Sequence, residues 1–144
     1  MTDSEAKRHL SALLHRLGLM TSSRPTAALI VEDQPFIGLV ASDILRETGF
    51  ETFHASDAAA AIALLRSHPE IEVVVTEAAL AGSMDGLELS RRVSAERPDI
   101  QLVVTSSGAE LTSSDVPPGT RLLRKPYASA ELRKVVSRMT LLDA

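Results

Sequence analysis

Five short apolar runs alternate with helix-length segments over most of this sequence. The apolar runs have the length of β-strands and cover residues 27–31, 50–55, 71–76, 100–106 and 120–125. The segments between and after them have the apolar spacing of helices and cover residues 35–49, 57–69, 85–98 and 129–142. Strands that alternate with helices of about ten to fifteen residues are typical of a parallel sheet covered on both faces. The alternation therefore predicts an α/β fold with a doubly wound five-stranded parallel sheet.

The connection over residues 107–119 departs from this alternation. Its sequence, SGAELTSSDVPPG, contains two prolines and several serines and threonines, and it has little apolar periodicity. Such a composition is typical of loops. We therefore expect at most a turn or two of helix where a full helix would normally join the fourth and fifth strands.

The first 25 residues precede this pattern and form a unit of their own. Residues 2–17 have helical spacing, and Thr2 followed by Glu5 fits a capping box. One face of the expected helix carries a stripe of leucines, which are Leu10, Leu13, Leu14 and Leu17. The segment TSSRPT, residues 21–26, is typical of a short linker. We therefore expect an N-terminal amphipathic helix and linker over 1–25 and one α/β domain over 26–144.

Composition excludes several classes of function. The chain of 144 residues is long enough for one ordinary domain, and it contains no cysteine that could form a disulfide, a thiolate nucleophile or a zinc site. A net charge of -4 and an aromatic content of 3% argue against a nucleic-acid surface. No apolar run approaches the roughly 20 residues that span a bilayer, and the first residues lack the apolar core of a secretory signal. We expect a soluble cytoplasmic protein that binds neither nucleic acid nor membranes.

Polar residues stand where the apolar runs end. Glu32 and Asp33 follow the first run, Glu77 follows the third, Thr105 lies near the end of the fourth and Lys125 ends the fifth. In an open parallel sheet, ligands bind outside the carboxyl ends of the strands. Carboxylate oxygens suit Mg²⁺, while lysine and threonine can bond a phosphoryl group or a carboxylate. This combination is typical of phosphoryl-transfer chemistry.

These motifs resemble the receiver domains of bacterial two-component response regulators, such as the chemotaxis receiver. The resemblance covers residues 26–142 and rests on four motifs in the expected order, which are LIVEDQP, VVVTEAALAGSMDG, VVTSS and RKPY. It implies a flavodoxin-like sheet of strand order 2-1-3-4-5. It also implies that Glu77 stands at the phosphoacceptor position, that Thr105 is the switch hydroxyl and that Lys125 contacts the phosphoryl group.

The resemblance further implies a magnesium site, so Mg²⁺ is a candidate cofactor. Its ligands would be three side chains and one backbone carbonyl, from Glu32, Asp33, Glu77 and Ala79. We expect Asp85, in the loop after the third strand, to cap the helix that follows it.

Two positions depart from the family's pattern. The residue at the acceptor position is a glutamate instead of an aspartate, and Leu122 stands where the family has a switch aromatic. A glutamate carries its carboxylate about 1.5 Å farther out, whereas in-line phosphoryl transfer tolerates little misplacement of the nucleophile. We therefore predict that Glu77 is a poor phosphoacceptor that pairs with Lys125 or hydrogen-bonds Thr105. It would then either hold the domain in an active-like state or belong to a scaffold that does not respond to phosphate.

The leading hypothesis is a stand-alone receiver-like signalling protein that is not an enzyme and acts by protein–protein contact, independently of phosphorylation. Its partner would be a histidine kinase or another signalling protein. The family's usual contact face corresponds to residues 107–139, where basic residues cluster. The leucine stripe of residues 2–17 also needs a partner, and a homodimer is favoured over packing on its own domain.

Three alternatives remain open. The chain could be a conventional Mg²⁺-dependent phosphoacceptor that a histidine kinase phosphorylates. A small Mg²⁺-dependent phosphotransferase or phosphatase is disfavoured because such enzymes generally place a second acid two residues after the nucleophile, where this chain has Ala79. A nucleotide-binding module of the flavodoxin type is disfavoured because VEDQP is acidic and would repel phosphate unless a metal intervened.

Overall fold

The computed structural model describes residues 2–17, 26–108 and 111–142, and its centre is a parallel sheet. The five strands lie in the order β2-β1-β3-β4-β5, and every neighbouring pair is parallel. The strands are β1 (Ala27–Val31), β2 (Glu51–Ala55), β3 (Ile71–Glu77), β4 (Gln101–Ser106) and β5 (Arg121–Arg124). The predicted doubly wound fold and its strand order are therefore confirmed.

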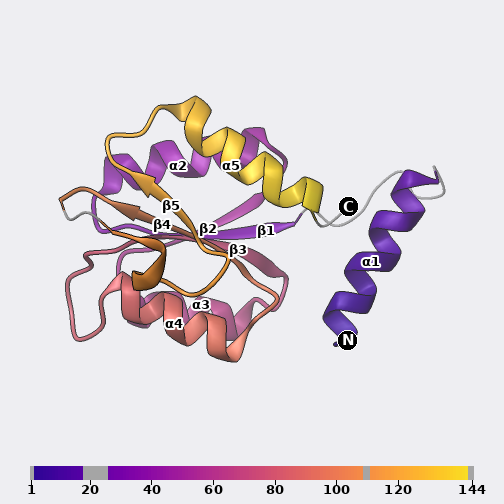
Figure 1. Cartoon of the computed structure of the whole chain (residues 1–144), viewed down its shortest axis with the longest axis horizontal. Helices are drawn as coiled ribbons and strands as arrows, with labels where there is room; N and C mark the ends of the chain where they lie inside the picture. Colours follow the sequence, from indigo (N-terminus) through magenta and orange to yellow (C-terminus); the bar gives the residue numbers. More distant parts are fainter. Residues whose placement is uncertain (1, 18–25, 109–110, 143–144) are drawn as a thin grey trace.

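Helices cover both faces of the sheet, as Figure 1 shows. The helices are α1 (Asp3–Arg16), α2 (Pro35–Glu47), α3 (Ala58–Ser67), α4 (Gly86–Glu96) and α5 (Ser129–Leu142). One face packs against α2 and α5, and the other packs against α3 and α4. Each helix begins and ends within two residues of the bounds that apolar spacing predicts.

The core consists of two apolar layers, one on each face of the sheet. Along β1, Leu29 and Val31 belong to the layer under α3 and α4, while Ala28 and Ile30 belong to the layer under α2 and α5. All four are buried. Burying a leucine, isoleucine or valine side chain contributes about 1.5–3 kcal/mol. This burial on both faces explains why the central strands are uninterrupted apolar runs.

Side-chain caps fix where two of the helices begin. The Asp57 carboxylate accepts a hydrogen bond of 2.8 Å from the backbone N–H of Ala60 at the start of α3. The Asp85 carboxylate accepts one of 2.9 Å from the backbone N–H of Glu88 at the start of α4. The cap expected at Asp85 is therefore confirmed, and it anchors α4 beside the end of β3.

The connection between β4 and β5 is thin. Among its described residues, the one helical element is the 3₁₀ turn η1 (Ser113–Asp115), which agrees with the sequence prediction. A cavity of about 300 Å³ opens beside it, between the ends of the two strands. Its lining includes Val104, Leu111, Leu122 and Arg124. This part of the sheet is consequently less covered than the rest.

Helix α1 belongs to neither layer (Figure 1). Arg8 joins it to the domain through an ion pair of 4.0 Å with Glu72 and a hydrogen bond of 3.4 Å to the carbonyl oxygen of Asp99. Leu10, Leu13 and Leu17 are 56%, 47% and 61% exposed. The domain therefore leaves most of the leucine stripe uncovered, and Leu14 is half-buried. Apart from Thr26, the linker predicted over 21–26 lies outside the described residues.

Among the described residues, no helix combines the length and the apolar character that crossing a bilayer requires.

Candidate functional site

Four of the predicted site residues come together at the carboxyl edge of the sheet. Glu32 follows β1 directly, Glu77 is the last residue of β3, Thr105 lies near the end of β4 and Lys125 follows β5 directly. Glu77 and Thr105 are also register partners across β3 and β4. The parallel sheet brings these residues together because all of its strands end at this edge.

A lysine ammonium group lies between two buried carboxylates. The Nζ atom of Lys125 contacts Oε1 of Glu32 and Oε2 of Glu77. The side chains are 9%, 5% and 4% exposed, respectively, so the three charged groups are almost fully removed from water. Ion pairs between buried groups are screened much less than surface pairs, so each partner depends strongly on the others.

Other donors in the protein also bond the two carboxylates. The backbone N–H of Gln34 donates to Oε2 of Glu32 at 3.2 Å. The backbone N–H of Ala79 donates to Oε1 of Glu77 at 3.4 Å, and the Thr105 hydroxyl donates to Oε2 of Glu77 at 3.4 Å. All four carboxylate oxygens therefore have a protein partner, which limits the cost of burying two negative charges.

Two opposing effects act on the charge of Lys125. Burial of the ammonium group by itself lowers its pKa, whereas the hydrogen bonds and charges of Glu32 and Glu77 raise it. The second effect prevails, and the pKa of Lys125 lies above its ordinary value of 10.5. The site therefore holds a permanent cation at neutral pH.

His54 makes a close contact with the backbone at Glu32. Nε2 of His54 lies 3.0 Å from the backbone carbonyl oxygen of Glu32. A Cβ atom at Gly38 would lie 2.8 Å from that same Nε2 atom, so a glycine on α2 leaves room for the imidazole. No sequence pattern predicts this contact, because His54 follows no ligand spacing and lies on β2, remote in sequence from α2 and β1.

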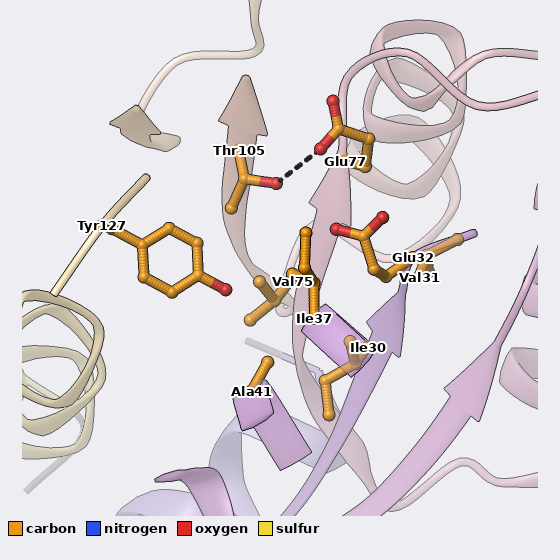
Figure 2. Close-up of a pocket in the computed structure, with 9 residues that line it drawn as sticks. All are labelled: Ile30, Val31, Glu32, Ile37, Ala41, Val75, Glu77, Thr105 and Tyr127. Atoms are coloured by element: carbon orange, nitrogen blue, oxygen red, sulfur yellow. Dashed lines mark hydrogen bonds between the residues drawn. The ribbon is translucent and has the colours of Figure 1, made fainter. Parts of the chain in front are cut away.

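Tyr127 is a second residue that the sequence analysis missed. Its ring lines the small cavity at the site together with Glu32, Glu77 and Thr105, as Figure 2 shows. Burial raises the pKa of its phenol, and the negative charges of Glu32 and Glu77 raise it further, whereas the positive charge of Lys125 lowers it. The net effect is a pKa above the ordinary value. Its place two residues after the lysine of RKPY was the one available signal, and no chemical pattern marked it.

The cavity itself is small. Its volume is about 10 Å³, which corresponds to about one water molecule. Figure 2 shows the carboxylates of Glu32 and Glu77 directed toward the same region from neighbouring strands, with the Thr105 hydroxyl bonded to Glu77. Protein groups therefore fill most of the space between the ends of β1, β3 and β4.

The residues at the expected magnesium site do not gather in a way that fits the ion. Asp33 is exposed, whereas Glu32 and Glu77 are buried and bonded to Lys125. Over the described ranges, no group of three or more acidic, histidine or cysteine residues is arranged to hold a metal. Mg²⁺ requires near-octahedral oxygen ligands at about 2.0–2.1 Å, and here an ammonium group already contacts both buried carboxylates.

Leu122, at the position of the expected switch aromatic, is half-buried. It packs against a small cluster formed by Ala78, Val104 and Val116. An aliphatic side chain at this position has no polar tip that could alternate between a buried and a solvated position.

Comparisons with known proteins agree with the fold. A family model described as the response regulator receiver domain matches residues 28–137. The chain is 25% identical to the response regulator receiver protein CpdR of Brucella abortus over 116 residues, which are 78% of this chain and 95% of CpdR. It is 35% identical to a protein-glutamate methylesterase/protein-glutamine glutaminase of Natronomonas pharaonis over 95 residues, which are 63% of this chain. The match spans 26% of that relative's length.

Solved structures show the same architecture. A response regulator receiver protein from Sinorhizobium medicae matches with a TM-score of 0.78 and 28% identity, over 85% of this chain and 100% of that one. The receiver domain of NtrX from Brucella abortus matches with a TM-score of 0.70 and 27% identity, over 77% of this chain and 95% of that one.

Proposed function

Because this chain belongs to the family of response-regulator receiver domains, we propose that it signals by binding a partner protein independently of phosphorylation at Glu77. The position of Glu77 at the end of β3 supports its correspondence to the family's phosphoacceptor. In this proposal the domain is a binding module of a two-component pathway, acts in the cytoplasm and catalyses no reaction.

The contact between Glu77 and Lys125 is the observation that carries this proposal. By resemblance to the family, Thr105 and Lys125 would contact a phosphoryl group on the acceptor. In this chain the Glu77 carboxylate itself contacts both residues. It supplies about one negative charge, compared with about 1.5 to 2 for a phosphoryl group, and thus reproduces part of the phosphorylated state.

The surface near residues 107–139 is the proposed contact face for a histidine kinase or another signalling protein. The cavity of about 300 Å³ beside η1 offers apolar lining from Leu111 and Leu122. Exposed basic residues lie close by in the sequence, at Arg121, Arg124, Lys134 and Arg138. An apolar recess with a basic surround would suit a partner that presents apolar and acidic side chains.

The exposed leucines of α1 support a second proposed contact. Three leucines that lie on one helical face and are about half exposed are suited to pairing with a second copy of the same helix. We propose that residues 1–25 serve this purpose, as a unit separate from the receiver domain over 26–144.

Intact-mass measurement tests the proposed independence from phosphorylation. The protein and its Glu77→Asp variant are incubated with Mg²⁺ and a small acyl-phosphate donor. We expect no added phosphoryl group on the wild type, because its carboxylate is held by Lys125 and Thr105. We expect the variant to gain one phosphoryl group, since the shorter side chain restores the family's acceptor.

A double variant, Glu77→Asp with Asp33→Asn, is the matched control. It should not be phosphorylated, although it keeps the aspartate acceptor. It lacks Asp33, the exposed acid after β1, which by resemblance to the family would be a ligand of the Mg²⁺ ion. Phosphorylation of wild-type Glu77 would contradict the proposal and make the chain a conventional phosphoacceptor. If neither protein is labelled, Glu77 is not what blocks the chemistry, and the proposed role of this residue is wrong.

A further inference from the structure

The group that links the two buried glutamates is part of the chain. We infer that the Lys125 ammonium takes the place of the divalent cation in this receiver domain, and that the folded site is complete without Mg²⁺. The resemblance to the family implies a Mg²⁺ ion at this site, with Glu32, Asp33 and Glu77 among its ligands. The inference rests on the proposed function for the identity of the site and adds what neutralises its charge.

The contacts of Lys125 are those expected of a bridging cation. Its single Nζ atom contacts one oxygen of Glu32 and one oxygen of Glu77, residues 45 positions apart on the neighbouring strand ends of β1 and β3. An ammonium group has three donors and carries one positive charge. It therefore joins the two carboxylates and offsets half of their combined charge.

Saturation of the carboxylates makes the lysine difficult to displace. The oxygens that do not contact Lys125 accept hydrogen bonds from the backbone N–H groups of Gln34 and Ala79. An incoming Mg²⁺ ion would have to displace donors that already bond the two carboxylates. It would also leave the ammonium group of Lys125, whose side chain is 9% exposed, without its partners. A buried charge that loses its partner costs several kcal/mol, so the exchange is unfavourable.

The length of residue 77 decides which cation occupies the site. The extra methylene of a glutamate carries its carboxylate about 1.5 Å farther from the backbone than an aspartate would. In this structure that reach brings Oε2 of Glu77 to both Lys125 and Thr105. An aspartate at position 77 would withdraw from the lysine and leave room for a hydrated ion. Glu77 is therefore a residue that determines cation specificity.

The exposure of Asp33 supports the same conclusion. Over the described residues, Asp33 does not combine with Glu32 and Glu77 into a group that could hold a metal. The two buried acids thus face an internal cation, while the third acid faces solvent.

Thermal unfolding with and without Mg²⁺ tests this inference without any phosphate donor. The full chain is melted in buffer with a chelator, in Mg²⁺ and in NaCl of equal ionic strength, with circular dichroism as the readout. We expect the Tm of the wild type to be the same in Mg²⁺ and in NaCl. We expect Lys125→Ala to gain about 4 °C at a tenfold excess of Mg²⁺ over its Kd, because the ion replaces the missing ammonium.

Glu77→Asp is the second variant, and it keeps the lysine. It should show a Mg²⁺-dependent increase in Tm even if Lys125→Ala does not fold. Lys134→Ala, which removes an exposed lysine from α5, is the matched control and should behave like the wild type. Direct Mn²⁺ binding, followed by water-proton relaxation, should be absent in the wild type and present in Glu77→Asp.

The outcomes separate this inference from the proposed function. A wild-type Tm that increases with Mg²⁺, or wild-type binding of Mn²⁺ at this site, overturns the inference. Failure of Glu77→Asp to gain any metal response also overturns it, because residue 77 would then not select the cation. A wild type that binds Mg²⁺ but is not phosphorylated would leave the proposed function intact and refute the inference alone.

Discussion

The backbone carbonyl oxygen of Glu77 lies so close to Gly86 that no side chain fits between them. A Cβ atom placed on Gly86 would be 1.7 Å from that oxygen and 3.0 Å from Oγ1 of Thr76. The backbone N–H of Gly86 also donates a hydrogen bond of 2.9 Å to the carbonyl oxygen of Ala78. The first residue of α4 therefore packs directly on the end of β3, and this contact sets the position of Glu77.

We expect Gly86→Ala to destabilise the protein and to disturb the site. The added methyl group must push backbone away from backbone, and overpacking of this kind costs about 1–3 kcal/mol or more. Urea unfolding measures the loss. Gly82→Ala is a useful comparison, because a Cβ atom there meets nothing within 4 Å, although the φ angle of 109° adds strain of its own. A Gly86→Ala variant as stable as the wild type would show that the end of β3 adapts freely.

Removing the bridging cation should be more costly than removing a surface charge. Lys125→Met leaves Glu32 and Glu77 facing each other without their shared partner, and breaking a buried pair in this way costs about 3–5 kcal/mol. Urea unfolding at neutral pH in the presence of a chelator measures this loss. Lys134→Met, at an exposed position on α5, should change the free energy of unfolding by less than about 0.5 kcal/mol.

A triple variant distinguishes lost pairing from lost packing. Glu32→Gln and Glu77→Gln, combined with Lys125→Met, remove the two carboxylate charges along with the ammonium group. Much of the stability lost in Lys125→Met should return, because no buried charge is left unpaired. If the triple variant is no more stable than Lys125→Met, the methylene chain of the lysine matters more than its charge.

Stability should fall at alkaline pH because of Lys125 and Tyr127. Both have a pKa in the folded state above their ordinary values of 10.5 and 10.0, so the folded protein holds these protons more tightly than the unfolded chain does. Their contribution is complete below the ordinary pKa values and is lost as the pH rises through the folded values. The free energy of unfolding should therefore decrease above about pH 10.

Two variants test whether this alkaline decrease in the free energy of unfolding comes from Lys125 and Tyr127. The difference in stability between the wild type and Lys125→Met should be constant from neutral pH to about pH 9 and should shrink at higher pH. Tyr127→Phe should show a shallower alkaline decrease than the wild type. Urea unfolding across this range gives both results, and parallel curves for all three proteins would rule out a titrating site.

Sequence periodicity predicted the fold well because each element carries its own local pattern. The five strands are apolar runs with polar ends, and Asp85 caps α4 as its place before the helix suggests. The same logic placed Glu32, Glu77, Thr105 and Lys125 at one edge, since parallel strands end together. The parallel topology alone was therefore enough to predict that these four residues lie together.

Contacts between side chains remote in sequence could be predicted only in part. The sequence left Glu77 a choice between Lys125 and Thr105, and the structure has it bonded to both. The imidazole of His54 beside Glu32 has no periodic or motif signal, and the ring of Tyr127 in the cavity is marked only by its place in RKPY. Asp33 and Glu32 are neighbours of the same type in sequence, yet only the fold decides which of them is buried.

The leucine stripe of α1 leads to the last prediction, which concerns oligomeric state. Arg8 attaches this helix to the domain through polar contacts, so its apolar face stays free to pair. If α1 pairs with a second copy, the full chain is a dimer, and Leu13→Glu shifts it to monomer because a charge enters the apolar seam. Size-exclusion chromatography with light scattering measures the mass at several concentrations. Lys7→Glu changes an exposed charge on the same helix and should leave the dimer in place. A wild-type chain that is monomeric at high micromolar concentration would contradict the proposed pairing, and the stripe would then have to serve a different partner.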